Sequence, residues 1–179
     1  MRGFAICTAP RSGSNFLSQL LSSTGQLGRP LEYFNGPGRR YFDDPNYPDD
    51  RGMQIDRILT MGATSNGIYG LKIFAHQYDW IEGQTQWTSM LPNLRFIFLR
   101  RRDMLGQAIS WARALQTGQY RHGQTSTGEA EFDGEANFGP SSRDRDRVRP
   151  MGNVFCQERD ITASLRLRGD RGYTAAGGR

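Results

Sequence analysis

Apolar residues gather in three short runs, separated by stretches in which apolar and polar residues alternate at helical spacing. Each run is long enough for a buried strand and too short for a helix. The three runs span Phe4–Cys7, Gly67–Phe74 and Leu94–Leu99. Helical spacing follows the first run and recurs in Met53–Met61, in Gln77–Leu91 and after Asp103. Strands that alternate with helices favour a parallel sheet joined by right-handed crossovers.

Polar residues predict where several of these elements end. Ser14 or Asn15 is predicted to cap the first helix, and Gly25 to follow its end. Asp103 is predicted to cap a later helix. The apolar positions of that helix are Met104, Leu105, Ala108, Ile109, Trp111 and Leu115. The segment Asn35–Arg51 is rich in glycine, proline, aspartate and arginine, so it is predicted to be a loop without regular structure.

The loop between the first strand and the first helix carries the clearest chemical signal. Thr8–Gly13 is small and polar and is broken by Pro10 and by Gly13. Backbone N–H groups in such a loop, followed by a helix N-terminus, favour an anion. A Walker A motif is excluded, because Arg11 is the only cation and no Gly-Lys-Ser/Thr ending follows. A phosphatase loop is excluded because the sixth position after Cys7 is glycine rather than arginine. An ordinary strand-to-helix turn remains the alternative.

Three ordered blocks of residues resemble one enzyme family. Thr8-Ala-Pro-Arg-Ser-Gly-Ser14 resembles the 5′-phosphosulfate-binding loop of sulfotransferases that use 3′-phosphoadenylyl sulfate. The blocks Leu27–Phe34 and Arg102–Gly118 are similar to the bacterial branch typified by trehalose 2-sulfotransferase. The resemblance implies an α/β domain with the three-layer, P-loop-like sulfotransferase fold around a central parallel sheet. It covers residues 1–120, and residues 121–179 form a polar, Arg-rich tail that leaves the C-terminal part incomplete.

The resemblance also implies roles for particular residues. The donor-binding residues of the loop and helix start are Pro10, Arg11, Ser12, Gly13, Ser14 and Asn15. Arg11 would also stabilise charge during catalysis, and Glu32 would be the general base. Arg100 and Ser110 would hold the 3′-phosphate of the donor, with Gln107 as the alternative to Ser110. Lys72, the only lysine in the chain, would lie near the phosphosulfate; the alternative is a charge at the edge of the sheet.

Glu32 has a second interpretation, that of a solvated acid in a loop. As a base it would be desolvated by Tyr33 and Phe34, which would raise its pKa toward the working range. The two histidines, His76 and His122, are competing candidates for the base, although both lie outside the blocks that match the family.

Composition narrows the class of protein. With 179 residues the chain is long enough for one domain with a substantial core. No apolar stretch suits a membrane span and no leader precedes the first strand, so the sequence predicts a cytoplasmic protein without integral membrane association. Two cysteines are too few for a disulfide framework, and one of them, Cys7, is predicted to be buried in a strand. No cluster has metal-ligand spacing, so no metal is expected.

The net charge of +5 belongs mostly to the tail. Residues 138–179 carry nine arginines against five acidic residues, and their composition predicts disorder. If the codons of Met151–Ile161 are translated from one base later, they permit an aromatic helix end like that of the family. A frameshift between about Glu135 and Arg143 is therefore a hypothesis, which resequencing of the gene decides.

The resemblance implies sulfuryl transfer from 3′-phosphoadenylyl sulfate, a co-substrate, to a hydroxyl of a carbohydrate or glycolipid. Trehalose is one candidate acceptor, and a homodimer is carried over from the branch. Three alternatives stay open: a nucleotide-dependent kinase, an inactive sulfotransferase remnant, and a protein that binds anions or nucleic acid through its Arg-rich tail. A nucleic-acid partner is not expected.

Overall fold

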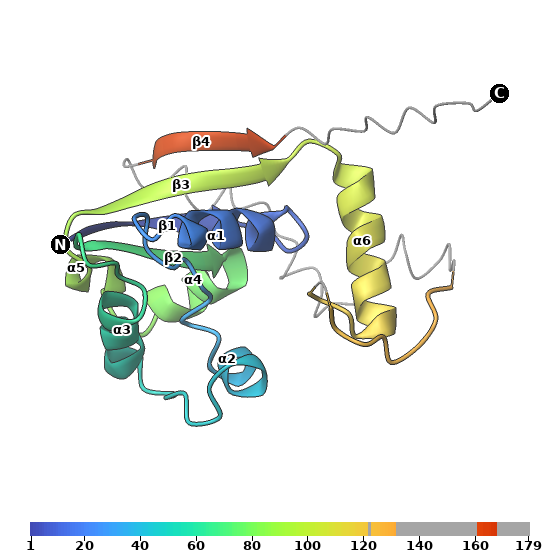
Figure 1. The fold of residues 1–179 in the computed structure, drawn as a ribbon, viewed down its shortest axis with the longest axis horizontal. Coiled ribbons are helices and arrows are strands. Elements are labelled where there is room, and N and C mark those ends of the chain that lie inside the picture. The colour runs from blue at the N-terminus through green and yellow to red at the C-terminus, as the bar shows by residue number, and fades with distance from the viewer. Residues whose placement is uncertain (122, 132–160, 168–179) are drawn as a thin grey trace.

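The computed structural model of the chain describes residues 1–121, 123–131 and the backbone of 161–167. Its strands form one parallel sheet in the order β2-β1-β3-β4 (Figure 1). The strands are β1 (Arg2–Thr8), β2 (Ile68–Phe74), β3 (Leu94–Arg101) and β4 (Ile161–Leu167). The first three confirm the predicted strands and their parallel pairing.

The fourth strand comes from the tail, which the composition predicts to be disordered. β4 pairs with β3 from Phe96 to Arg101, with an irregularity between Phe96 and Ile97. The prediction is therefore wrong for residues 161–167, whose alternating Ile161, Leu165 and Leu167 suit a strand. The predictions for residues 132–160 and 168–179, including the frameshift, lie outside the described residues.

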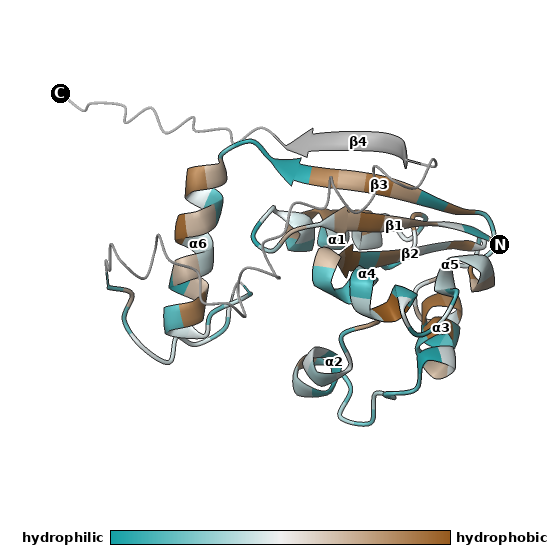
Figure 2. Cartoon of the chain, turned by 180° about the vertical axis from the view of Figure 1, so that it is seen from behind, coloured by the Kyte–Doolittle hydropathy of each residue, from teal (hydrophilic) through white to brown (hydrophobic). Residues whose placement is uncertain are grey.

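Helices surround the sheet, which gives the predicted α/β character. They are α1 (Ser14–Ser23), α2 (Gly36–Phe42), α3 (Arg51–Thr60), α4 (Ala75–Glu82), α5 (Trp87–Met90) and α6 (Met104–Thr117). Opposite views place α1 and α4 on opposite faces of the sheet (Figures 1 and 2). Helix α6 lies beyond the carboxyl end of β3, across the direction of the strands.

Two helices begin where local signals differ from the prediction. The N-cap of α1 is Gly13, not Ser14 or Asn15, because the loop needs a left-handed residue immediately before the helix. The predicted loop Asn35–Arg51 contains α2. The Asn35 carboxamide oxygen accepts from the Gly38 N–H at 3.1 Å, and Pro37 lies in the first turn. A cap and an early proline are enough to start a short helix in a Gly/Pro-rich stretch.

The helix predicted over Gln77–Leu91 is two helices, α4 and α5. The chain turns at Gly83, and the N–H groups of Gln84 and Thr85 both donate to the Ile81 carbonyl. This turn lets Trp87 enter the core, where its side chain is fully buried. The apolar residues of the segment do have helical spacing, but they belong to two short helices, α4 and α5, that cover the same face of the sheet.

The main core lies between the sheet and α3–α5. Trp87 is packed edge-to-face against Phe34, Tyr78 and Phe96. β1 and β2 contribute Ala5, Cys7, Tyr69, Leu71 and Ile73 to the same core. Because side chains alternate along a strand, Lys72 faces the other side of the sheet, toward α1. Cys7 is buried, as predicted.

The apolar stripe of α6 does not face this core. Leu105 is 65% exposed and Met104 is 62% exposed, while Asp103 caps the helix as predicted by accepting from the Gly106 N–H at 2.8 Å. The helix ends at Gly118, which has a positive φ. Figure 2 shows several hydrophobic (brown) positions along α6. The sequence therefore predicted the helix correctly, although its stripe is uncovered among the described residues.

The segment after α1 lies beside β2 because of Gly28. The Arg29 N–H donates to the Gly62 carbonyl at 2.8 Å, and the Lys72 N–H donates to the Leu31 carbonyl at 2.9 Å. Gly28 has φ +70°, and a Cβ there would lie 2.6 Å from the Gly70 nitrogen. No side chain fits this approach, so glycine is required where the chain turns toward Glu32.

Gly28→Ala is expected to destabilise the fold by about 2–5 kcal/mol, the sum of left-handed strain and forced overpacking. Gly25→Ala is the matched control, since Gly25 has φ +63° but no atom within 4 Å of its Cβ position. It should cost only about 1–2 kcal/mol. Denaturant unfolding of both variants makes the comparison, and equal losses would contradict the close approach at Gly28.

Among the described residues no helix is long and apolar enough to cross a membrane. Within the same part of the chain no group of three His, Cys, Asp or Glu side chains could hold a metal ion.

Candidate active site

The loop after β1 takes an unusual backbone conformation. Arg11 has φ +60° and Gly13 has φ +90°, so two residues of the loop are left-handed. A left-handed arginine is uncommon and costs conformational energy, which surrounding contacts must offset. Residues of alternating handedness turn successive N–H groups toward one side, and the first turn of α1 adds N–H groups without intrahelical acceptors. Such a backbone suits a bound anion, and the anion-binding role of the loop stays a prediction.

Internal hydrogen bonds hold the loop against β3. The Thr8 hydroxyl donates to the Leu99 carbonyl at 3.0 Å and lies 2.6 Å from the Ser12 hydroxyl. Ser12 is only 2% exposed, so its side chain serves the loop itself. Of the other predicted donor-binding residues, Ser14 is also buried, at the start of α1.

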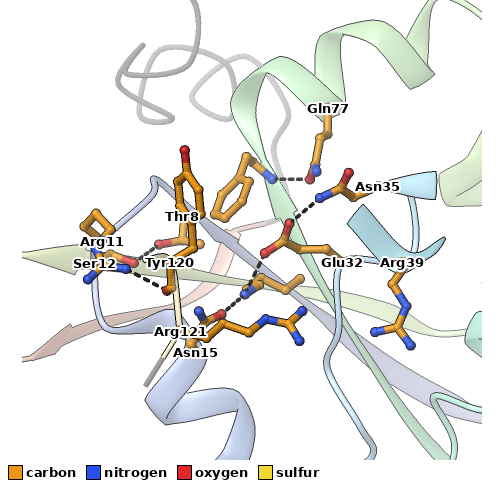
Figure 3. A network of polar contacts seen from close by, with 12 residues as sticks. Thr8, Arg11, Ser12, Asn15, Glu32, Asn35, Arg39, Gln77, Tyr120 and Arg121 are labelled. Carbon is orange, nitrogen blue, oxygen red and sulfur yellow. Dashed lines mark hydrogen bonds and ion pairs between the residues drawn. The ribbon is translucent and has the colours of Figure 1, made fainter. Parts of the chain in front are cut away.

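Arg11 connects the loop to α6. Its Nε donates to the Ser110 hydroxyl at 2.8 Å. Its Nη1 donates to the Tyr120 carbonyl at 2.8 Å (Figure 3). The Gln107 amide donates to the Pro10 carbonyl at 2.6 Å. Both residues that the sequence offered for the donor's 3′-phosphate, Ser110 and Gln107, therefore contact the loop. A guanidinium has five N–H donors, so Arg11 keeps donors for a ligand.

The charge around Arg11 is positive. Burial and the neighbouring Arg101 lower the pKa of the Arg11 guanidinium, although the guanidinium stays charged. Arg101 is paired with Asp103 at 3.2 Å, whereas no ion pair of Arg11 occurs among the described residues. A hollow of about 340 Å³ opens beside it and is lined in part by Ser110 and Arg113. An anion in this hollow would meet the positive charge of both Arg11 and Arg113.

Glu32 lies on the segment that Gly28 brings beside β2. One carboxylate oxygen lies 2.9 Å from the Lys72 ammonium, and the other accepts from the Asn35 amide at 3.0 Å. The Glu32 side chain is 22% exposed and that of Lys72 is 4% exposed. Figure 3 shows Glu32 and Asn35 on one side of the polar network and Arg11 and Ser12 on the other. Glu32 is thus a held, largely buried carboxylate rather than a solvated loop acid.

The expected rise in the pKa of Glu32 is wrong. Burial does raise the pKa of this carboxyl, but the charge and hydrogen bond of Lys72, the hydrogen bond of Asn35 and the charge of Arg121 outweigh it. The net result is a pKa below the usual glutamate value. Tyr33 and Phe34 are themselves buried in the core, so the sequence correctly indicated desolvation and missed the compensating cation.

Lys72 joins the two halves of the site. Besides Glu32, its ammonium donates to the side-chain oxygen of Asn15, in the first turn of α1. The loop helix and the carboxylate are therefore held by one buried cation. The predicted position of Lys72 near the phosphosulfate stays a prediction. Its pairing with Glu32 was missed, because a lysine in a strand carries no signal that names its acidic partner.

Arg100 lies at the end of β3 and is exposed. Its guanidinium lies over the Phe98 ring, 5.9 Å from the centroid. The neighbouring Arg101 is the arginine that reaches the loop, with Nη1 3.5 Å from the Arg11 carbonyl. Ser110 accepts from Arg11 in this structure, and the predicted binding of the 3′-phosphate by Arg100 and Ser110 stays a prediction.

Of the two histidines that compete for the base, His76 begins α4 and stacks on Phe74, with ring centroids 5.8 Å apart. His122 lies outside the described residues. The residues that sequence reasoning missed are Asn35, Tyr120 and Arg121. Asn35 alone had a local signal, because an asparagine before Gly-Pro-Gly is a good helix cap.

The site matches a known family. A profile of the Stf0 sulphotransferase family matches residues 3–132. The chain belongs to this family. It is 26% identical over 162 residues to the trehalose 2-sulfotransferase of Mycobacterium tuberculosis, which covers 68% of this chain and 60% of that protein. It is 26% identical over 156 residues to the trehalose 2-sulfotransferase of Mycolicibacterium smegmatis, which covers 66% of this chain and 58% of that protein.

The chain thus spans about 60% of the length of the curated relatives that it matches. The matched region contains the loop, Glu32, Lys72 and α6, so the whole site described above lies within it. Family membership confirms the resemblance drawn from the three sequence blocks.

Proposed function

We propose that this protein is a sulfotransferase that moves a sulfuryl group from 3′-phosphoadenylyl sulfate to a carbohydrate hydroxyl. The observation that carries the proposal is Lys72, which contacts both the helix of the anion-binding loop and the Glu32 carboxylate. The helix start proposed for donor binding and the proposed base are therefore joined through one buried side chain. Membership of the sulphotransferase family supports this assignment.

In the proposed reaction the bond between sulfur and the donor's phosphate oxygen breaks, and a bond forms between sulfur and the acceptor oxygen. Glu32 takes the proton of the acceptor hydroxyl, which is a weak nucleophile at neutral pH. The electron pair of the broken bond stays on the phosphate, where Arg11 and the loop N–H groups stabilise the added charge. Positioning and fixed dipoles supply the catalysis, so the mechanism uses no metal.

The acceptor is assigned by class only. The two relatives are named for trehalose, and a sugar or glycolipid hydroxyl suits the proposed base. Resemblance to the trehalose enzymes would place a glutamine that contacts the sugar at position 10 and an acidic residue at position 29. This chain has Pro10 and Arg29 there, so other glycans are candidates beside trehalose. A cytoplasmic location and a homodimer remain predictions.

Thermal unfolding in the presence of nucleotides tests donor binding. Adenosine 3′,5′-bisphosphate, the product left by the donor, should stabilise the full chain by about 2.7 kcal/mol at one hundred times its dissociation constant. ATP and a single-stranded RNA should stabilise it less. Transfer from labelled 3′-phosphoadenylyl sulfate to trehalose and to other glycans then tests the reaction.

The outcomes separate the alternatives. Binding of the bisphosphate together with transfer supports the proposal, and binding without transfer to any acceptor identifies an inactive remnant. Stabilisation by RNA that weakens steeply with salt would instead favour nucleic-acid binding. A preference for ATP would favour the kinase alternative.

Arg100→Ala tests the site for the 3′-phosphate. Loss of a hydrogen bond to a charged group should cost about 1.5–3 kcal/mol in affinity for the bisphosphate. Adenosine 5′-phosphate, which lacks the 3′-phosphate, should bind the variant as it binds the native protein. Calorimetric titration with both nucleotides measures the difference.

Arg95→Ala is the matched control, because Arg95 is an exposed arginine at the opposite end of β3. It should leave both affinities unchanged. Equal losses for the two nucleotides in Arg100→Ala would mean that Arg100 does not read the 3′-phosphate, and Arg101→Ala would then be the next variant to measure.

A further inference from the structure

We propose that Lys72 is a positioning residue that holds the Glu32 carboxylate charged and in a fixed place relative to the anion-binding loop. This inference rests on the proposed function of Glu32 as the base. It gives the only lysine of the chain a role toward the base rather than toward the donor's sulfuryl group.

The placement of Lys72 is the first step. It lies in the middle of β2, paired in register with Ile6 of β1, and its side chain is 4% exposed. Burying an ammonium group is costly unless it is paired and hydrogen-bonded. Leu71 and Ile73 on either side belong to the apolar core on the other face of the sheet, so Lys72 is a charged residue in an otherwise apolar stretch of β2.

The partners of the Lys72 ammonium offset the cost of burying it. Glu32 reaches it from the segment after Gly28, and Asn15 reaches it from α1. Among the described residues no hydrogen bond or ion pair joins Glu32 to Asn15 directly, so Lys72 is the connection between these two side chains. A displacement of α1 on donor binding would therefore move Lys72 and, through it, the Glu32 carboxylate.

The charge balance around Glu32 supports the same role. The cations that face the carboxylate are Lys72 on β2 and Arg121 after α6, while Asn35 donates a neutral hydrogen bond. Arg121 also lies 3.4 Å from Asp43, so its charge is shared with another acid. Lys72 is thus the cation that keeps Glu32 ionised, and a carboxylate must be ionised before it can accept a proton.

The test replaces Lys72 with methionine, which keeps the length and removes the charge, and with arginine, which keeps the charge. The pKa of Glu32 is read from the carboxyl carbon signals of the six glutamates, with Glu32→Gln identifying its signal. Since Lys72 is the only lysine, selective nitrogen labelling gives one ammonium signal for the native protein. Neither reading depends on transfer activity.

In Lys72→Met the pKa of Glu32 should rise by about 1–3 units, the size of the shift caused by one close opposite charge. In Lys72→Arg it should stay near the native value. Arg40→Met is the control, because Arg40 pairs with Asp49 away from Glu32 and its loss should leave the pKa unchanged. If Lys72→Met does not fold, the arginine variant alone decides. A rise in the pKa of Glu32 in Lys72→Arg, which keeps the charge, would overturn the role of the charge.

Transfer kinetics test the positioning. The acidic limb of the rate profile should move upward with the pKa in Lys72→Met, and the plateau rate should fall about tenfold or more because the base is no longer held. Affinity for adenosine 3′,5′-bisphosphate should stay within about twofold of the native value, as a residue that acts through the base requires. A plateau rate near the native one, an unmoved pKa, or a large loss of nucleotide affinity would each overturn the proposal. Absence of transfer in the native protein would overturn the proposed function instead, while the two NMR readings would still decide whether Lys72 controls Glu32.

Discussion

Glu32→Gln is expected to cut the rate of sulfuryl transfer by about 10²–10⁴-fold, the usual range for the loss of a general base. Glutamine keeps the shape of the side chain, and its single carbonyl oxygen can still accept from Lys72. Its NH2 group cannot accept from Asn35, and the side chain cannot take the acceptor's proton. Affinity for adenosine 3′,5′-bisphosphate should be nearly unchanged, because Glu32 belongs to the acceptor side of Lys72. Single-turnover transfer and calorimetric titration measure the two quantities separately.

The control for this variant is Glu82→Gln, a change of the same kind at the exposed end of α4. It should leave the transfer rate within about twofold of the native value, as surface substitutions usually do. Near-native transfer by Glu32→Gln would assign the proton to a histidine or to the substrate itself. If resequencing reveals a frameshift, the comparison is made in the chain with the restored reading frame.

The fold was predictable where short-range patterns decide it. The apolar runs of β1, β2 and β3, and the cap Asp103 of α6, act within a few residues, so the sequence displays them directly. The position of α2 was missed because Gly, Pro and Asp favour turns on average, and the specific cap at Asn35 outweighs that average. β4 was missed because one short alternating stretch is a weak signal inside a polar tail.

The site was predictable as a set of residue types but not as a set of partners. The turn between β1 and α1 followed from Pro10 and Gly13, because their backbone requirements are local. That this turn binds an anion stays a prediction. The pairing of Lys72 with Glu32 depends on the left-handed turn at Gly28, which brings two distant segments together. No sequence spacing encodes that approach, and the direction of the Glu32 pKa shift was mistaken for the same reason.

Arg11→Ala is expected to lower kcat/KM by about 10⁴–10⁵-fold. Loss of a charge-assisted contact should cost on the order of 10²-fold in donor affinity. Loss of a group that stabilises the developing charge on the leaving phosphate should cost a further 10²–10³-fold or so in rate. Arg11 is suited to both tasks, because it bears no ion pair among the described residues and keeps free guanidinium donors after bonding Ser110 and Tyr120.

Arg11→Ala also removes the hydrogen bonds to Ser110 and Tyr120, so it could act by displacing α6. The experiment must therefore separate the loss of charge from the loss of the bracing that these two bonds provide. Arg11→Lys keeps the charge and loses the planar fork that reaches both Ser110 and Tyr120. If charge dominates, the lysine variant should recover much of the bisphosphate affinity that alanine loses; if bracing dominates, both variants should lose it alike. Without ligand, the free energy of unfolding should fall by a similar, small amount in both variants, since the bonds to Ser110 and Tyr120 are lost in each. Unchanged affinity for the bisphosphate in Arg11→Ala would remove Arg11 from the donor site, and with it the assignment of this loop as the phosphosulfate-binding element.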